Sequence, residues 1–227
     1  MPINFSLEQF AQVSDCFCET GTYHGNAVIK ALEAGFKNIA TVEVSKVNQE
    51  KARKRIDEHP MSKAAHIDYV LGDAEQNMIR LVEFAKSHEA EHPVFWLDAH
   101  THVFEDGTRT EGNECPLISE ISAVNQGFNG SAILLIDDLR IVGAKGVSPR
   151  GLKGRVRAAC NAIFNPDELL AMIKPGWGKS VDLLTILRIA MEAPDMSFRL
   201  LDGIEPLDVL CVYPGKLHEA LFGQASN

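Results

Sequence analysis

Acidic side chains recur where hydrophobic segments of this chain end. Five apolar runs each end at a carboxylate or are followed by one within two residues, and such runs are typical of buried strands. In an open parallel sheet the carboxyl ends of the strands lie along one edge, where ligands bind. Carboxylates that converge there could bind a cation, accept hydrogen bonds from a ribose or act as a base. These acids are Glu19, Glu43, Asp73, Asp98, Asp137 and Asp138.

Helix capping is the competing explanation for these acids. An aspartate after a strand commonly caps the next helix or stabilises a turn. Capping could account for two or three of them, but five successive strand ends with the same feature favour a ligand site.

The first strand end has the most specific pattern. Residues 15–26 contain a short apolar strand, an acidic and glycine-bearing turn, and a helix that begins near Gly25. Small residues at such a turn leave backbone N–H groups free around an open crevice. A second strand at 39–43 ends in Glu43. Together the two strand ends predict a nucleoside pocket.

Strands and helices alternate along the first part of the chain. This alternation favours right-handed βαβ units and a parallel sheet. Apolar runs without polar alternation predict that helices cover both faces of that sheet. The expected strands are 15–19, 38–43, 67–71, 94–97 and 132–136, and the expected helices are 3–13, 26–36, 46–59, 75–86 and 116–128.

The pattern is weaker after Asp138. Helices are expected at 166–173 and 181–191, and strands at 198–201 and 207–213. We therefore predict one α/β domain over residues 1–227. Its parts are a core at 15–138, a variable substrate or cap segment at 139–195 and a terminal hairpin at 196–213.

Composition indicates a soluble globular enzyme. The 227 residues are 45% hydrophobic and 23% charged, enough for one large buried core. A net charge of −9 argues against general nucleic-acid binding. Five scattered cysteines without a CxxC pair indicate a reducing compartment, and no signal peptide or membrane span is visible. We expect a cytoplasmic protein that acts on a small molecule without a membrane partner; a homodimer is left open.

The chain resembles the class I S-adenosylmethionine-dependent methyltransferases. The matching motifs are Glu-Thr-Gly-Thr-Tyr-His-Gly at 19–25, Glu43, and Gly-Asp-Ala at 72–74. It is closer to the small sugar and macrolide O-methyltransferase-like proteins, in which runs similar to 95–100, 115–120 and 133–138 occur. The resemblance implies a Rossmann-like, doubly wound, mostly parallel seven-stranded sheet with the last strand antiparallel. It also implies a methyl-donor pocket over the first two strands.

The residue types agree with S-adenosylmethionine as the cofactor. Glu43 can accept both ribose hydroxyl protons, as an acid does at the same offset in dinucleotide sites. Glu19 can contact the ammonium group, and Asp73 can accept from the adenine amine while Ala74 leaves room for the ring. The predicted cofactor-binding residues are Glu19, Thr20, Gly21, Thr22, Gly25, Glu43, Asp73 and Ala74.

Two other nucleotide sites fit less well. A nicotinamide site usually needs G-x-G-x-x-G against the pyrophosphate, but Tyr23 occupies the middle glycine position. The carboxylate of Glu19 at the start of the turn would also repel a pyrophosphate. Gly-Lys-Ser at 178–180 suggests a P-loop, but that motif requires glycine where the chain has Ile173.

A metal site is predicted at Asp98, Asp137 and Asp138, where the related sugar O-methyltransferases suggest one. Carboxylates from two strands can hold Mg²⁺, which would orient a substrate hydroxyl and lower its pKa. His100 and His102 would instead favour a zinc- or manganese-like site. The alternative is that Asp137 caps the next segment and His102 is a solvated loop residue. Asp98 and His100 are the predicted catalytic residues, as general base or substrate contacts.

The predicted activity is methylation of a small hydroxylated acceptor. Residues 140–157 contain six basic and no acidic residues, so they could hold an anionic acceptor or form a solvated loop. Residues 101–113 could form a lid. Two other functions stay open: a metal-dependent hydrolase or phosphoryl-handling enzyme that uses Asp98, His100 and Asp137, and a non-catalytic binding protein.

Overall fold

The fold is built on one mixed β-sheet. The computed structural model describes residues 3–99, 116–139, 183–204 and 206–223. Seven strands in these residues form a sheet with the order β3-β2-β1-β4-β5-β7-β6. The first five strands are parallel, and β7 is antiparallel to both of its neighbours. The strands are β1 Cys16–Thr20, β2 Asn38–Glu43, β3 His66–Leu71, β4 Val94–Leu97, β5 Ile133–Ile136, β6 Met196–Leu201 and β7 Val209–Pro214.

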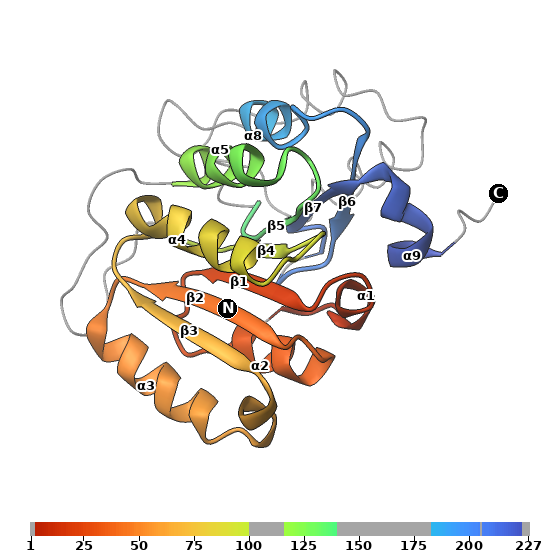
Figure 1. Ribbon diagram of the computed structural model, residues 1–227. Helices are drawn as coiled ribbons and strands as arrows, with labels where there is room; N and C mark the ends of the chain where they lie inside the picture. The colour runs from red at the N-terminus through yellow and green to blue at the C-terminus, as the bar shows by residue number, and fades with distance from the viewer. Residues whose placement is uncertain (1–2, 100–115, 140–182, 205, 224–227) are drawn as a thin grey trace.

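Helices cover both faces of the sheet, as the uninterrupted apolar strands predict (Figure 1). In β1, Cys16 and Cys18 face a core shared with α4, α5 and α8. Phe17 faces the opposite core, which is shared with α1, α2, α3 and α9. The helices are α1 Glu8–Ala11, α2 Asn26–Ala34, α3 Lys46–Asp57, α4 Ala74–Ser87, α5 Leu117–Phe128, α8 Leu183–Ala190 and α9 His218–Phe222, with 3₁₀ turns at Pro60–Ala64 and Gly215–Leu217.

The predicted architecture is confirmed, including the antiparallel last strand. Most helices begin or end one or two residues from the expected positions, and the differences at the leading helix and at Pro116 affect the interpretation. The leading helix is confined to Glu8–Ala11, and Pro116 precedes α5 instead of occupying its first turn. The expected helix at 166–173 lies outside the described residues. In the part of the chain that the structure describes, no helix is both long enough and apolar enough to cross a membrane.

The strand register brings the chemically interesting ends together. Thr20 at the end of β1 is opposite Val42 on β2 and Leu97 on β4, and Leu97 is opposite Ile136 on β5. The residues that follow these strands therefore share one edge of the sheet. Because β7 is antiparallel, this edge also contains its amino end rather than its carboxyl end.

Candidate active site at the carboxyl edge of the sheet

The turn after β1 is tightly folded against β2 and β4. The N–H groups of Gly21 and Thr22 both donate to the carbonyl oxygen of Val42, at 3.0 and 3.2 Å. Gly21 has φ of +85°, and a Cβ there would lie 3.0 Å from the carbonyl oxygen of Asp98. A side chain at Gly25, with φ of +74°, would lie 2.8 Å from Ile56. The turn itself thus requires both glycines.

Glu43 connects this turn to the start of α3. Its side chain is 2% exposed. Oε2 accepts a hydrogen bond from the N–H of Tyr23 at 2.7 Å, and Oε1 accepts one from the N–H of Ser45 at 2.9 Å. Tyr23 adopts a φ of +46°, which is unusual for a residue with a side chain. Each carboxylate oxygen has a second lone pair, so these bonds are compatible with acceptance from a ribose diol.

Glu19 is buried at the end of β1. The hydroxyl of Thr41 donates to its Oε2 at 2.8 Å, and Thr41 also shares a short hydrogen bond with the hydroxyl of Thr22. Burial raises the pKa of Glu19 to about 8, with smaller contributions from the charges of Asp98 and Glu43, and the Thr41 bond opposes the shift. A cationic ligand near this carboxyl would favour its ionised form.

Asp73 has the structural role that capping predicts. Its Oδ1 accepts hydrogen bonds from the N–H groups of Glu75 at 2.9 Å and Gln76 at 3.4 Å, and so caps α4. Ala74 is the first residue of that helix and is buried. The N–H of Gly72 donates to the carbonyl oxygen of Glu43 at 2.9 Å, which holds the cap beside β2.

The three aspartates predicted as metal ligands lie together. One carboxylate oxygen from each of Asp98, Asp137 and Asp138 lies within 4.8 Å of the others. Asp137 and Asp138 are buried, and the N–H of Asp138 donates to Oδ1 of Asp137 at 2.8 Å. Burial, then the charges of Asp98 and Asp138, raise the pKa of Asp137 to about 8. Three hard oxygen donors that repel one another suit Mg²⁺ better than a softer ion.

Asp208 is a further acid at this edge, and the sequence analysis did not identify it. It precedes β7, is 2% exposed and contributes to the raised pKa of Asp137. Its carbonyl oxygen accepts a hydrogen bond from Leu139 at 2.9 Å. A Cβ at Gly203 would lie 3.1 Å from Cβ of Asp208 and 3.3 Å from Oδ1 of Asp137, so this loop packs closely on the aspartates. An acid just before an antiparallel strand is the signal that could have identified it.

Glu120 is the second acid without a predicted role. It lies in the first turn of α5 and is 0% exposed. Burial raises its pKa to about 8, and the charges of Asp73 and Asp98 add to the shift. The helical spacing of Leu117, Ile121 and Val124 could have revealed that Glu120 is buried, because it lies on the same apolar face of the helix.

Several predicted parts of the site lie outside the described residues. These are the candidate catalytic residue His100, the neighbouring His102, the expected lid at 101–113 and the basic segment at 140–157.

Comparisons with known proteins support the fold. No protein-family model matches the chain, and no curated protein matches it in sequence. Solved structures do match. The cofactor-bound protein Rv0187 from MTB aligns with a TM-score of 0.53 and 14% identity, over 95% of this chain and 82% of that one. The SAH-bound methyltransferase PaMTH1 from Podospora anserina aligns with a TM-score of 0.50 and 16% identity, over 91% and 75%. At these identities the likeness shows a shared fold, which agrees with the expected Rossmann-like, mostly parallel seven-stranded sheet.

Proposed function

We propose that this chain is an S-adenosylmethionine-dependent methyltransferase that methylates a hydroxyl group of a small acceptor. One observation carries the proposal: buried Glu43 at the end of β2 is held by the N–H groups of Tyr23 in the glycine turn and of Ser45, the N-cap of α3. On a fold shared with an SAH-bound methyltransferase, this carboxylate is suited to a ribose diol.

The charge of the site favours a cationic cofactor. Glu43 is hydrogen-bonded to Tyr23 of the turn, and Glu19 is linked to the turn through Thr41. Asp98 follows the adjacent strand β4. S-adenosylmethionine has a sulfonium and an ammonium group, which these carboxylates would attract, whereas a pyrophosphate would be repelled. Gly21, Thr22 and Gly25 belong to this turn, and we assign them to the wall of the donor pocket.

A divalent ion is part of the proposal. Asp98, Asp137 and Asp138 would hold it, and Gly203 lies so close to Asp137 that a Cβ there would be 3.3 Å from its Oδ1. Bound Mg²⁺ would supply Lewis acidity to the acceptor hydroxyl. Asp98, together with His100, is assigned to contact with the acceptor and to uptake of its proton, while the fold aligns the hydroxyl with the methyl group. We further propose that the acceptor is anionic, because residues 140–157 contain six basic and no acidic residues.

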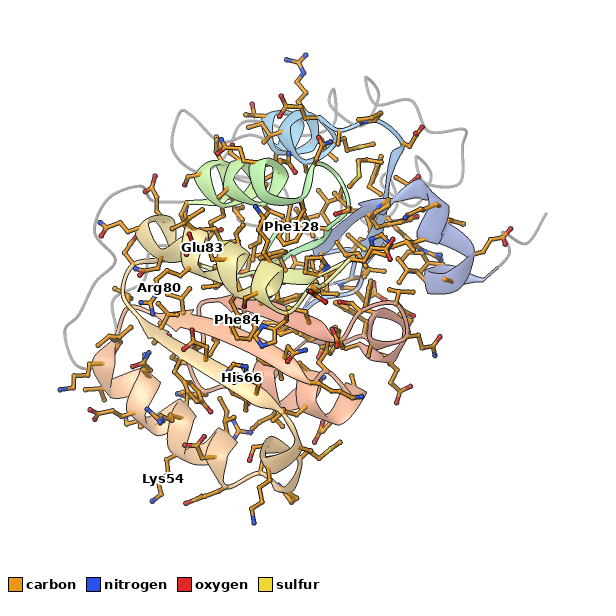
Figure 2. All side chains as sticks on the ribbon, in the orientation of Figure 1. Lys54, His66, Arg80, Glu83, Phe84 and Phe128 are labelled. Carbon is orange, nitrogen blue, oxygen red and sulfur yellow. The ribbon has the colours of Figure 1, made fainter. Side chains whose placement is uncertain are left out.

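Calorimetric titration with S-adenosylmethionine and S-adenosylhomocysteine tests the cofactor. We expect micromolar binding of both ligands by the wild type, and binding at least about tenfold weaker in Glu43→Gln, which loses a charge that faces the diol. Glu83→Gln is the matched control because this side chain is exposed on α4 (Figure 2). Lack of binding by the wild type would remove the proposal.

The aspartate cluster also suits a phosphoryl-handling enzyme, so the two activities must be separated. Methyl transfer to hydroxylated acceptors should require the donor and be stimulated by Mg²⁺. Mg²⁺-dependent turnover of a generic phosphate ester without any donor would instead favour the hydrolase. Donor binding with no methylated product, and no effect of Asp98→Asn, would favour a non-catalytic binding protein.

A further inference from the structure

A buried carboxyl group on α5 has no part in the chemistry described so far. Glu120 on α5 is 0% exposed. Neither of its oxygens has a hydrogen-bond partner among the described residues. The Thr20 hydroxyl is near enough to favour the ionised form of Glu120, but without standard hydrogen-bond geometry. A buried carboxyl without a donor costs on the order of 1–3 kcal/mol or more, so a positive charge nearby would stabilise its ionised form.

The surroundings of Glu120 place it at the junction of β1 and β4. Thr20 ends β1, and its hydroxyl oxygen accepts a hydrogen bond from the N–H of Asp98 at 3.3 Å. The charges that most affect Glu120 are those of Asp73, Asp98 and Glu75, all of them negative. Glu120 therefore lies near the carboxyl edge where the donor is proposed to bind, and the negative charges around it favour a cation nearby.

The proposed reaction changes the charge of the ligand in this region. The acceptor oxygen forms a bond to the methyl carbon as the carbon–sulfur bond breaks, and the bonding electron pair stays on sulfur. The sulfonium thereby becomes a neutral thioether, and the acceptor proton passes to a base. A negative group near sulfur attracts the donor and loses that attraction once the product forms.

We propose that the ionised carboxylate of Glu120 makes the site prefer the cationic methyl donor over its neutral product, S-adenosylhomocysteine. This inference rests on the proposed function. Glu120 acts through its charge and not through a ligand contact. A neutral replacement of the same shape should therefore weaken donor binding and leave product binding unchanged. The interaction of one unit charge with the sulfonium across a partly buried site corresponds to about a tenfold difference between the Kd of the product and that of the donor.

The test is titration of S-adenosylmethionine and S-adenosylhomocysteine, without acceptor, into the wild type, Glu120→Gln, Glu120→Asp and the exposed control Glu83→Gln. A buffer near pH 8.5 is above the pKa of this carboxyl, which is about 8, so that most of Glu120 is ionised before the donor binds. In Glu120→Gln the ratio of product Kd to donor Kd should fall about tenfold, through the donor Kd alone. Glu120→Asp and Glu83→Gln should keep the wild-type ratio.

The possible outcomes separate this inference from the proposed function. Equal weakening of the binding of both ligands in Glu120→Gln would indicate a purely structural role and would overturn the inference. Unchanged affinities for both ligands would also overturn it. Failure of the wild type to bind either ligand would overturn the proposed function as well. If Glu120→Gln does not fold, Glu120→Met, of similar volume and apolar, should show the same loss of ratio.

Discussion

The buried carboxyl of Glu120 predicts how stability depends on pH. The ordinary pKa of this group is 4.5, and burial raises its pKa to about 8 in the folded protein. Between these two pH values the folded state keeps a proton that the unfolded state has lost. This contribution to the free energy of unfolding is therefore complete below pH 4.5 and is lost as pH rises toward 8.

The size of the effect follows from the shift. Each pH unit in this window lowers the free energy of unfolding by about 1.4 kcal/mol, so the whole shift corresponds to an upper limit of roughly 5 kcal/mol. Relaxation of the protein and water entry on ionisation reduce such values, and we expect about 2 kcal/mol or more. Glu120→Gln cannot ionise, so its stability relative to the wild type should increase with pH.

Urea unfolding from about pH 5 to about pH 9 measures the effect in the wild type, Glu120→Gln and the exposed control Glu83→Gln. Subtraction of the wild-type curve removes the titration of all other groups. The Glu120→Gln difference should rise toward high pH, whereas the control difference should stay constant. A Glu120→Gln difference that does not depend on pH would mean that Glu120 is ionised in the fold, and the account of its environment would be wrong.

Other substitutions test separate parts of the site. Gly21→Ala places a Cβ 3.0 Å from the Asp98 carbonyl at a φ of +85°, so thermal unfolding should show a loss of about 1–3 kcal/mol, and an unchanged melt would contradict the close approach. Asp73→Ala should lose about 1 kcal/mol with the α4 cap, and Asp73→Ser should recover it. If Asp73→Ser still binds donor weakly by calorimetry, Asp73 also contacts the cofactor. Asp137→Asn should weaken Mg²⁺ binding at least about tenfold, measured by titration with MgCl₂; equal affinity in wild type and variant would exclude this metal site.

The main architecture could be predicted because it depends on local sequence. The apolar runs that became β1, β4 and β5 specify strands covered on both faces, and their alternation with helices specifies parallel pairing. Once the strands are parallel, the acids that follow them must share an edge. The meeting of Asp98, Asp137 and Asp138 follows from this geometry.

The individual role of each acid depended on its tertiary surroundings. Asp73 and Asp137 both follow strands, yet one caps a helix while the other is buried among carboxylates. No local pattern separates these cases, because the deciding contacts come from other elements. Asp208 joins the site only because β7 runs antiparallel to β5.

The sequence by itself determined the class of fold, the edge at which ligands should bind and the acidic character of that edge. Only the tertiary structure decided that Glu19, Glu120 and Asp137 are buried deeply enough for their pKa values to rise to about 8. The reason is physical: a strand end is specified by adjacent residues, whereas desolvation and the field of other charges are set by residues far apart in the chain.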